Sequence, residues 1–272
     1  MLYKKVTPKQ MIFSPVRVFV YISHSLIFFG CFLPDTKVRI ELEKYNFVPL
    51  VVFLIFYITF MWFYYKTSVA DTFVKQDDAP LNTDEDLFFC EQCNHYCPLR
   101  ASHCKHCKKC VLRRDHHCNF LDTCIGMGNH FYFLCFLFFL LLFDITAINV
   151  FKVGMKDGQP FIKWLVTTMP CNICLFGSIA SIIQPAILFP IHFFLALTNN
   201  TTWEFVKGST ITYFRGWHIH LSPFSKGLIG NLKEFCTMHK NHPTYFIPRT
   251  PEELEKYKAD NSFISNDTYD CC

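Results

Sequence analysis

Residues 90–129 read CEQCNHYCPLRASHCKHCKKCVLRRDHHCNFLDTCIGMGN. These forty residues hold eight of the fifteen cysteines and five of the twelve histidines of the chain. The cysteines stand in close pairs beside histidines, a pattern that is typical of zinc binding rather than of a disulfide framework. Long apolar segments flank the stretch on both sides. The fold must therefore accommodate a polar, metal-binding module between apolar parts of the chain.

The composition of the 272-residue chain is typical of a membrane protein. Charged residues make up 18% of the sequence and aromatic residues another 18%, with 32 phenylalanines. The mean hydropathy is +0.20, and the apolar residues cluster in runs, as they do in segments that span a bilayer. The net charge of +4 is modest. We therefore expect a lipid bilayer, and no nucleic acid, among the partners of the chain.

Four apolar runs are candidates for transmembrane helices. The first is short and contains three polar residues, whereas the second has about the ~20 apolar residues that one span requires. Asp144 interrupts the third run, and because a charge is costly within a bilayer we expect it to face the interior of the helix bundle or the far interface. Residues 152–170 are predicted as a loop, and prolines are expected to kink the last run. The four runs are Val18–Leu33, Phe47–Tyr65, Phe131–Phe151 and Cys171–Leu197.

The predicted fold is an α-helical polytopic membrane protein with four transmembrane helices and a cysteine-rich module between the second and third. Residues 1–17 carry four basic residues and no acidic one, and the module adds further lysines and arginines. By the positive-inside rule this bias places both termini and the module in the cytosol, where thiols stay reduced. The expected parts are a cytosolic N-terminus (1–17), helices 1 and 2 (18–65), the zinc-binding module (66–130), helices 3 and 4 (131–197) and a cytosolic C-terminal region (198–272).

The module has enough ligands for two zinc ions. Cysteines separated by two residues can reach one tetrahedral ion, because a tight turn directs both sulfurs inward. Two such sites need eight ligands, and six cysteines with two histidines supply them if two cysteines stand apart. Cys97 lies outside any pair, and Cys118 lies beside Asp115, His116 and His117. Either could be the spare thiol, but only Cys118 has a base within reach.

The tetrad Asp115-His116-His117-Cys118 has the composition of a nucleophilic thiol with its base. A thiol attacks as its thiolate, an adjacent imidazole can take the proton, and a carboxylate can orient that imidazole. We interpret Cys118 as the nucleophile, His116 as the base and Asp115 as the orienting acid, with His117 left to the metal. The alternative is that these residues are packed or bind metal, so the spacing indicates zinc more strongly than catalysis.

The pattern of the module closely resembles the DHHC family of protein S-acyltransferases (palmitoyltransferases). A short Thr-Thr-x-Glu motif of that family is matched by Thr201-Thr202-Trp203-Glu204, and Asn231 with Phe235 resembles its C-terminal motif of an asparagine and an aromatic residue. The resemblance covers the four-span layout and roughly residues 88–134 and 198–236. The matching residues run Cys90-x2-Cys93-x3-Cys97-Pro98-x-Arg100-x2-His103-Cys104-x2-Cys107-x2-Cys110-x4-Asp115-His116-His117-Cys118-x5-Cys124-Ile125-Gly126-x2-Asn129-x3-Phe133.

The resemblance implies a two-step acyl transfer at a membrane surface. Cys118 would take a fatty acyl group from acyl-CoA as a thioester and pass it to a cysteine of a membrane-associated protein. His116 would be the general base and Asp115 would polarise it, while Thr201, Thr202 and Glu204 would pack against the tetrad and hold it. Two structural zinc ions are implied, one held by Cys90, Cys93, His103 and Cys110, the other by Cys104, Cys107, His117 and Cys124.

The sequence departs from the family pattern at a few positions near the site. Asn119-Phe120 replaces the usual Pro-Trp after the tetrad, Thr123 stands in place of an asparagine, and Cys97 in place of a basic residue. These changes bear on rate and acyl-CoA affinity rather than on the type of reaction. Two interpretations are open for the basic residues of the module: they bind the phosphates of CoA, or they reflect positive-inside bias and contact with anionic lipid. They are Lys105, Lys108, Lys109, Arg113 and Arg114.

Two other classes of protein compete with the acyltransferase interpretation. A membrane adaptor with a double-zinc docking module would need no Asp115-His116 pair beside a spare thiol. A thiol redox protein would need paired cysteines that the metal leaves free. Short spans favour a thin membrane of the early secretory pathway, so the endoplasmic reticulum or the Golgi is the expected location.

Overall fold

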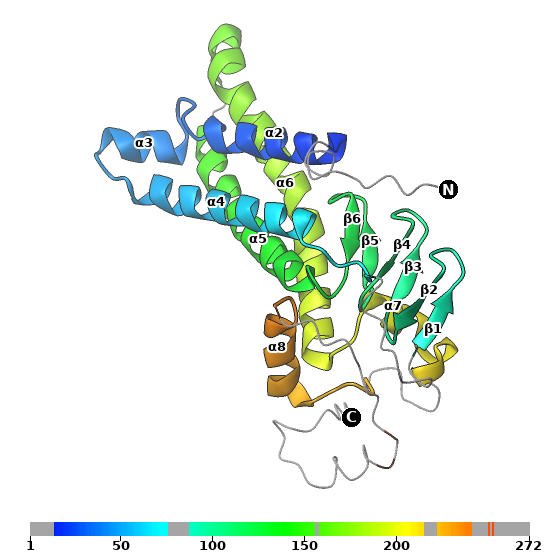
Figure 1. Ribbon diagram of the computed structural model, residues 1–272. Helices are drawn as coiled ribbons and strands as arrows, with labels where there is room; N and C mark the ends of the chain where they lie inside the picture. Colours follow the sequence, from blue (N-terminus) through cyan, green and yellow to red (C-terminus); the bar gives the residue numbers. More distant parts are fainter. Residues whose placement is uncertain are drawn as a thin grey trace. The chain divides into compact units, whose positions relative to one another are not determined.

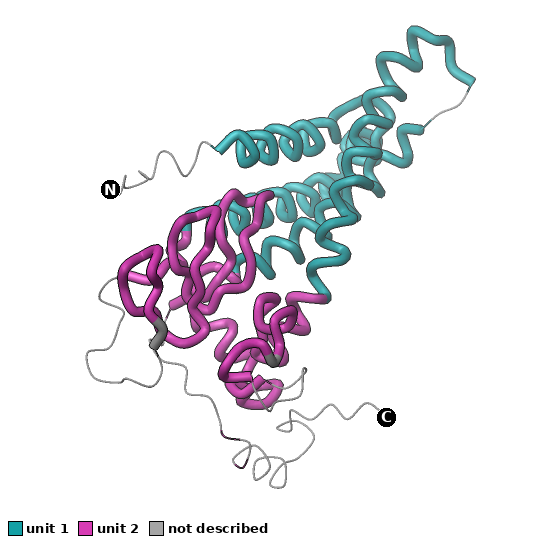
Figure 2. The backbone as a smooth tube through the Cα atoms, turned by 90° about the vertical axis from the view of Figure 1, so that its right-hand side faces the viewer, with its two compact units in different colours: residues 1–69, 132–190 teal, residues 70–131, 191–272 magenta. Residues whose placement is uncertain are grey.

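The structure is a computed structural model that describes residues 14–75, 87–155, 158–214, 222–240, 250 and 252. Part of each predicted cytosolic segment therefore lies outside the described residues: 1–13 of the N-terminus, 76–86 of the module, and most of the chain beyond residue 240. The chain folds into two compact units, coloured in Figure 2. Unit 1 comprises residues 1–69 and 132–190, and unit 2 comprises residues 70–131 and 191–272.

Helices occupy all four positions where the sequence predicts a span (Figure 1). Among the described residues, three helices are long and apolar enough to cross a membrane: α4 (Val48–Val69), α5 (His130–Phe151) with the 3-10 turn η2 (Lys152–Gly154), and α6 (Phe161–Thr198). The first helix, α2 (Pro15–Gly30), has 16 residues and is about 24 Å long, less than the ~30 Å hydrocarbon core. The short helix α3 (Lys37–Glu43) follows, capped by Thr36.

Helix α6 corrects the predicted loop over residues 152–170. It begins at Phe161 and continues through Pro170, Pro185 and Pro190. A proline removes one backbone hydrogen bond from a helix, and apolar helices tolerate that loss where neighbouring groups satisfy the freed carbonyl. The prolines therefore interrupt the hydrogen bonding of α6 without ending it.

The interior of unit 1 is an aromatic cluster next to polar contacts between helices. Phe143 of α5 is fully buried and stacks on Phe53 of α4, with ring centroids 4.9 Å apart. Beside it, the hydroxyl of Ser181 in α6 donates to the carboxyl of Asp144 at 2.9 Å and lies 3.2 Å from Nε2 of His24 in α2. Asp144 is buried, which confirms that it faces the interior of the bundle.

Unit 2 contains three short antiparallel hairpins that lie side by side in chain order (Figure 1). The first two have the same turn, in which Asn94 N–H donates to Cys90 O and Lys108 N–H donates to Cys104 O, both at 2.7 Å. Asn94, Lys108 and, in the third hairpin, Asp122 all have positive φ. The strands are β1 (Leu87–Cys90) with β2 (His95–Pro98), β3 (Ser102–Cys104) with β4 (Lys109–Val111), and β5 (His116–Cys118) with β6 (Thr123–Ile125).

The remainder of unit 2 supports these hairpins. Residues 70–75 run beside β4, where Phe73 bridges to Val111 and Leu112 N–H donates to Thr72 O at 2.9 Å. The end of α6 leads into α7 (Thr202–Lys207), two 3-10 turns, η3 (Gly208–Thr210) and η4 (Thr212–Phe214), and α8 (Gly227–Thr237). A capping box starts α7, because the side chains of Thr201 and Glu204 each accept from the other's backbone N–H.

Gly128 is a position where this packing leaves no room for a side chain. A Cβ there would collide with the backbone carbonyl of Asp71. We expect Gly128→Ala to destabilise the protein by about 1–3 kcal/mol, because backbone must move to relieve the overlap. The measurement is the unfolding midpoint of the purified protein in detergent. Gly177→Ala in α6 is the control, since its Cβ would lie 3.6 Å from Ile27, an ordinary contact. Equal midpoints for the two variants would contradict the expectation.

Candidate active site and zinc clusters

The three hairpins repeat one another at an interval of fourteen residues. Cys90, Cys104 and Cys118 each end the first strand of their hairpin, and each pairs across it, with His95, Lys109 and Thr123 respectively. A second cysteine follows three residues later in the first two hairpins, at positions 93 and 107, whereas the third hairpin has the buried Leu121 there. Cys118 therefore stands at a metal-ligand position whose partner cysteine is absent.

The first cluster of metal-ligand side chains joins the first two hairpins. Cys90 and Cys93 come from the turn of the first hairpin, and His103 and Cys110 are directly opposite each other in the second. Nδ1 of His103 lies 3.6 Å from Cys90 Sγ, 3.2 Å from Cys93 Sγ and 4.0 Å from Cys110 Sγ. The sulfurs of Cys93 and Cys110 are 3.7 Å apart.

The second cluster repeats this arrangement one hairpin further along. Cys104 and Cys107 come from the second turn, and His117 and Cys124 face each other in the third hairpin. Nδ1 of His117 lies 3.8 Å, 3.3 Å and 3.6 Å from the sulfurs of Cys104, Cys107 and Cys124. A tetrahedral zinc site has edges of ~3.8 Å between sulfurs and ~3.5 Å between sulfur and nitrogen, given its bond lengths. Both clusters fit zinc, and they hold the ligand sets that the resemblance implies.

Cys97, the other cysteine predicted to be spare, lies beside the first cluster. Its thiol is buried and 3.6 Å from Nδ1 of His95, and both lie near Cys110. The expectation that only Cys118 has a base within reach is therefore wrong. The imidazole beside Cys97 differs from His116 in its partner, because Nδ1 of His95 lies 2.9 Å from the backbone oxygen of Tyr96 rather than from a carboxylate.

Strand β5 explains how one tetrad can serve both metal and chemistry. Successive side chains of a strand point to opposite faces, so His117 faces the second cluster while His116 and Cys118 share the other face. His116 hydrogen-bonds to Cys118, and its Nδ1 lies 2.6 Å from Oδ1 of Asp115. Cys118 and Asp115 are buried, and the side chain of His116 is 28% exposed. Thiol, imidazole and carboxylate therefore form one hydrogen-bonded chain.

The electrostatics of this chain favour a charged imidazole. Burial alone would lower the pKa of His116, but its hydrogen bonds to Asp115 and Cys118 raise the pKa to about 9. Burial would likewise raise the pKa of Asp115, yet His130 and His116 nearby hold it well below its usual range. Asp115 is consequently an anion at neutral pH. A cationic His116 can donate a hydrogen bond to the sulfur of Cys118.

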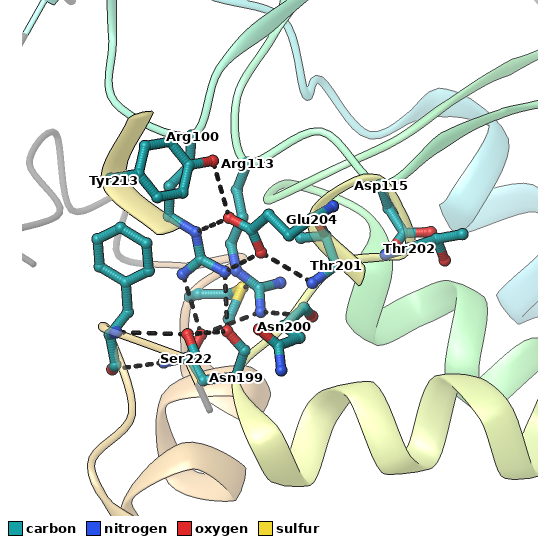
Figure 3. A network of polar contacts seen from close by, with 12 residues as sticks. Arg100, Arg113, Asp115, Asn199, Asn200, Thr201, Thr202, Glu204, Tyr213 and Ser222 are labelled. Atoms are coloured by element: carbon teal, nitrogen blue, oxygen red, sulfur yellow. Dashed lines mark hydrogen bonds and ion pairs between the residues drawn. The ribbon is translucent and has the colours of Figure 1, made fainter. Parts of the chain in front are cut away.

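The second oxygen of Asp115 is held by the start of α7. The backbone N–H of Thr202 donates to Oδ2 at 2.8 Å, as Figure 3 shows at its right-hand side. This contact confirms for Thr202 the expectation that the Thr-Thr-x-Glu segment packs against the tetrad. With one N–H donor on each oxygen, the carboxylate cannot rotate without losing a hydrogen bond.

Glu204 connects α7 to the loop between the first two hairpins. Its carboxylate accepts hydrogen bonds from Nε (2.6 Å) and Nη2 (2.7 Å) of Arg100. This buried ion pair is drawn in Figure 3. Oδ1 of Asn199 accepts from Arg100 at 3.0 Å and from Arg113 at 3.1 Å, and its amide donates to Phe224 O at 3.0 Å. The Arg100–Glu204 ion pair and the hydrogen bonds of Asn199 thus fix the position of α7. They thereby also fix the backbone N–H of Thr202 that binds Asp115.

Comparison with known proteins identifies one part of the chain. Residues 83–209 match the family model described as DHHC palmitoyltransferase. Residues 83–209 belong to the DHHC palmitoyltransferase family. This DHHC domain contains both clusters, the tetrad, and the whole of α7.

The curated relatives carry names of the same kind. The chain is 38% identical over 123 residues to palmitoyltransferase ERF2 of Eremothecium gossypii, which covers 44% of this chain and 32% of that protein. It is 29% identical over 235 residues to human palmitoyltransferase ZDHHC12, covering 80% of this chain and 87% of that protein. Probable protein S-acyltransferase 5 of Arabidopsis thaliana is 32% identical over 166 residues, which are 55% of this chain and 31% of that protein. The chain thus spans less than half of the Eremothecium and Arabidopsis relatives.

Glu204 supports a stability prediction for the DHHC domain. Replacing it with alanine would leave the guanidinium of Arg100 buried without its counter-charge, which typically costs about 3–5 kcal/mol. We expect Glu204→Ala to lower the unfolding midpoint and to reduce any activity of Cys118, because α7 loses its anchor. Glu43→Ala is the matched control, since its partner Arg39 is an exposed neighbour on α3 and such pairs contribute little. An unchanged midpoint in Glu204→Ala would contradict the role of the pair.

The basic residues of the DHHC domain do not form a single surface for CoA phosphates. Arg113 is fully buried and donates to Asn199 and Asn200. Arg114 donates to His103 O at 2.9 Å and stacks on Trp203. Arg113 is therefore a wrong candidate for that role, and its charge instead serves the network around Asn199.

The C-terminal motif predicted at Asn231 and Phe235 has defined contacts next to the DHHC domain. The amide of Asn231 donates to Leu197 O at 2.7 Å and to Ser225 Oγ at 2.6 Å, which fastens α8 to the end of α6. The ring of Phe235 lies 5.1 Å from the ring of His130. Sequence reasoning missed His130 and His192, both buried beside Asp115. The available signal was one histidine directly before the third apolar run and another within the fourth.

Proposed function

We propose that the chain is a protein S-acyltransferase that moves a fatty acyl group, of the palmitoyl type, from acyl-CoA to cysteines of membrane-associated proteins. The observation that carries the proposal is the hydrogen-bonded series Cys118–His116–Asp115, built on a hairpin that lacks the second metal-binding cysteine. The family name and the names of the relatives support this activity.

In the first step the thiolate of Cys118 attacks the carbonyl carbon of the acyl-CoA thioester. A new carbon–sulfur bond forms, the bond to the CoA sulfur breaks, and the proton held by His116 is available to the departing thiolate. Asp115 keeps the ring oriented and stabilises its charge while it holds that proton. The product is an acyl group in thioester linkage to Cys118.

In the second step a cysteine of the protein substrate attacks the acyl group on Cys118. His116, now neutral, accepts the proton of the incoming thiol, and Cys118 leaves as a thiolate beside the imidazolium. Each step exchanges one thioester for another, so little driving force is needed, and the tetrad returns to its starting state.

We further propose that zinc is structural. Cys90, Cys93, His103 and Cys110 would hold one ion, and Cys104, Cys107, His117 and Cys124 the other. When bound, each zinc fixes the positions of two hairpins relative to each other. Because His117 lies between His116 and Cys118 in the chain, its attachment to the second ion would hold β5 in register.

We also propose a membrane topology of four spans. Helices 1 and 2 would cross at residues 18–65 and helices 3 and 4 at 131–197, with 1–17, the module 66–130 and 198–272 in the cytosol. Packing supports α2 as a fourth member of the bundle: Phe28 stacks on Tyr57 of α4 at 4.4 Å, and His24 reaches Ser181 of α6. A Cβ on Gly30 would come within 2.7 Å of Cys174. The endoplasmic reticulum or the Golgi would be the host membrane.

The test is direct labelling of the purified protein in detergent. It is incubated with an alkyne-bearing fatty acyl-CoA, coupled to a fluorophore, and treated with neutral hydroxylamine, which cleaves thioesters. The proposal expects a label that hydroxylamine removes and that moves to a cysteine peptide carrying a lipid anchor. A protein that binds two zinc ions and never takes up the label would be an adaptor, and the proposal would be wrong.

A further inference from the structure

Two buried histidines lie close to Asp115, in addition to its hydrogen-bond partners His116 and Thr202. His130 is the first residue of α5, and His192 is in the last two turns of α6. Nε2 of His130 lies 3.9 Å from Oδ2 of Asp115, and Nδ1 of His192 lies 3.9 Å from Oδ1. All three side chains are buried. Each carboxylate oxygen thus has a hydrogen-bond donor within 2.8 Å and a second imidazole nitrogen at 3.9 Å.

The two histidines bond to each other rather than to Asp115. Nε2 of His130 and Nδ1 of His192 are 3.0 Å apart, a hydrogen-bond distance, whereas 3.9 Å is too long for one. A bond between two imidazole nitrogens needs one bare acceptor, so at most one of the rings carries a charge. The pair therefore supplies at most one positive charge near Asp115, and the close ion-pair partner of that carboxylate is His116, at 2.6 Å.

Other residues of unit 2 hold the pair in place. The ring of Phe235 in α8 packs edge-on against His130, with centroids 5.1 Å apart. The ring of His192 also lies 5.5 Å from that of His116. A continuous line of contacts leads from α8 through both histidines to the tetrad. This line gives the C-terminal motif a route by which to influence Cys118.

We propose that His130 and His192 are positioning residues, which form a hydrogen-bonded pair that keeps Asp115 directed at His116. The proposal rests on the proposed function for its purpose, since the aligned carboxylate serves acyl transfer. Without the pair, Asp115 could turn away from His116. Water could also enter the space that the two rings fill and hydrogen-bond to the carboxylate in place of His116. A displacement of about 1 Å in such a group can cost on the order of 10²-fold in rate.

The same three side chains could instead hold a metal ion, since a carboxylate and two imidazoles are common ligands and their ligand atoms lie close together. The hydrogen-bond distance between the two rings favours the pair. Metal content distinguishes the two arrangements: the pair expects only the zinc of the two cysteine clusters, in the wild type and in variants of His192 alike.

The experiment compares His192→Leu, which removes the hydrogen bond, with His192→Asn, whose amide can replace Nδ1. The first readout is the rate at which iodoacetamide alkylates Cys118, followed by mass spectrometry of the Cys118 peptide. The second is the rate of acyl labelling at saturating acyl-CoA, together with its KM. His239→Leu is the control, because that ring stacks on Phe131 in the same unit and does not take part in the pair.

We expect His192→Leu to slow both reactions of Cys118 by about 10–100-fold with unchanged KM and zinc content. His192→Asn should recover most of the rate, and His239→Leu should match the wild type. Equal alkylation in His192→Leu and the wild type would overturn the proposal, as would loss of a metal ion or equal damage in the Leu and Asn variants. If alkylation follows the expected order while no protein takes up acyl label, the positioning role stands and the acyltransferase function is wrong.

Discussion

Replacing Cys118 with serine is expected to abolish hydroxylamine-labile acylation of the protein. The chain has fifteen cysteines, but six of them are grouped in the two clusters, where zinc would occupy their sulfurs. Cys118 alone, among the described residues, combines a hydrogen bond to an imidazole with a carboxylate behind that imidazole. A serine hydroxyl there is a far weaker nucleophile at neutral pH than a thiolate. The fold should survive, because the change removes no ligand of either cluster.

Cys236→Ser is the matched control for this experiment. Cys236 is a half-buried free cysteine on α8 in the same unit, so its loss tests whether any accessible thiol can take the label. We expect the control to label like the wild type, and both variants to keep the zinc content of the wild type. Labelling that persists in Cys118→Ser and disappears in Cys236→Ser would move the nucleophile to α8 and contradict the mechanism.

The zinc clusters could be predicted because their geometry is local. Within each cluster, two cysteines come from one tight turn and a histidine and a cysteine from the next hairpin. The ligands are at most 20 residues apart in the chain, as Cys104 and Cys124 are. Sequence spacing encodes such arrangements directly. The fourteen-residue repeat was present in the sequence as well, at Cys90, Cys104 and Cys118, and would have identified Cys118 as the unpaired position without reference to any family.

The support of the site could not be predicted in the same way. Arg100 and Glu204 are 104 residues apart, and His130 and His192 are 62 apart. Nothing in the local sequence shows that a histidine in an apolar run will lie beside a carboxylate of a distant loop. The start of α6 was also misplaced, because a proline at position 170 predicts a helix boundary more often than a helix interior. Contacts between distant segments depend on the packing of the whole unit.

Removing zinc is expected to unfold the three hairpins. Each strand has only three or four residues, and an isolated two-stranded hairpin is at best marginally stable in water. The apparent free energy of binding of one structural zinc is about 10–16 kcal/mol, which is as large as the whole stability of a typical domain, about 5–15 kcal/mol. A strong chelator should therefore expose residues 87–125 to protease and stop acylation of Cys118. Added zinc should restore both the resistance to protease and the acylation.

Single substitutions can distinguish the two clusters, because only the second includes a tetrad residue. Cys124→Ala should remove one zinc and abolish acylation. His117 then loses the metal that holds it in place, and with it the positions of its neighbours His116 and Cys118 on β5. Cys90→Ala also removes one zinc, but β5 keeps its own cluster, so we expect a partial loss of rate. The measurements are zinc per chain by elemental analysis and the labelling rate of Cys118. If both variants bind one zinc and Cys124→Ala labels as fast as Cys90→Ala, the second cluster does not position the tetrad.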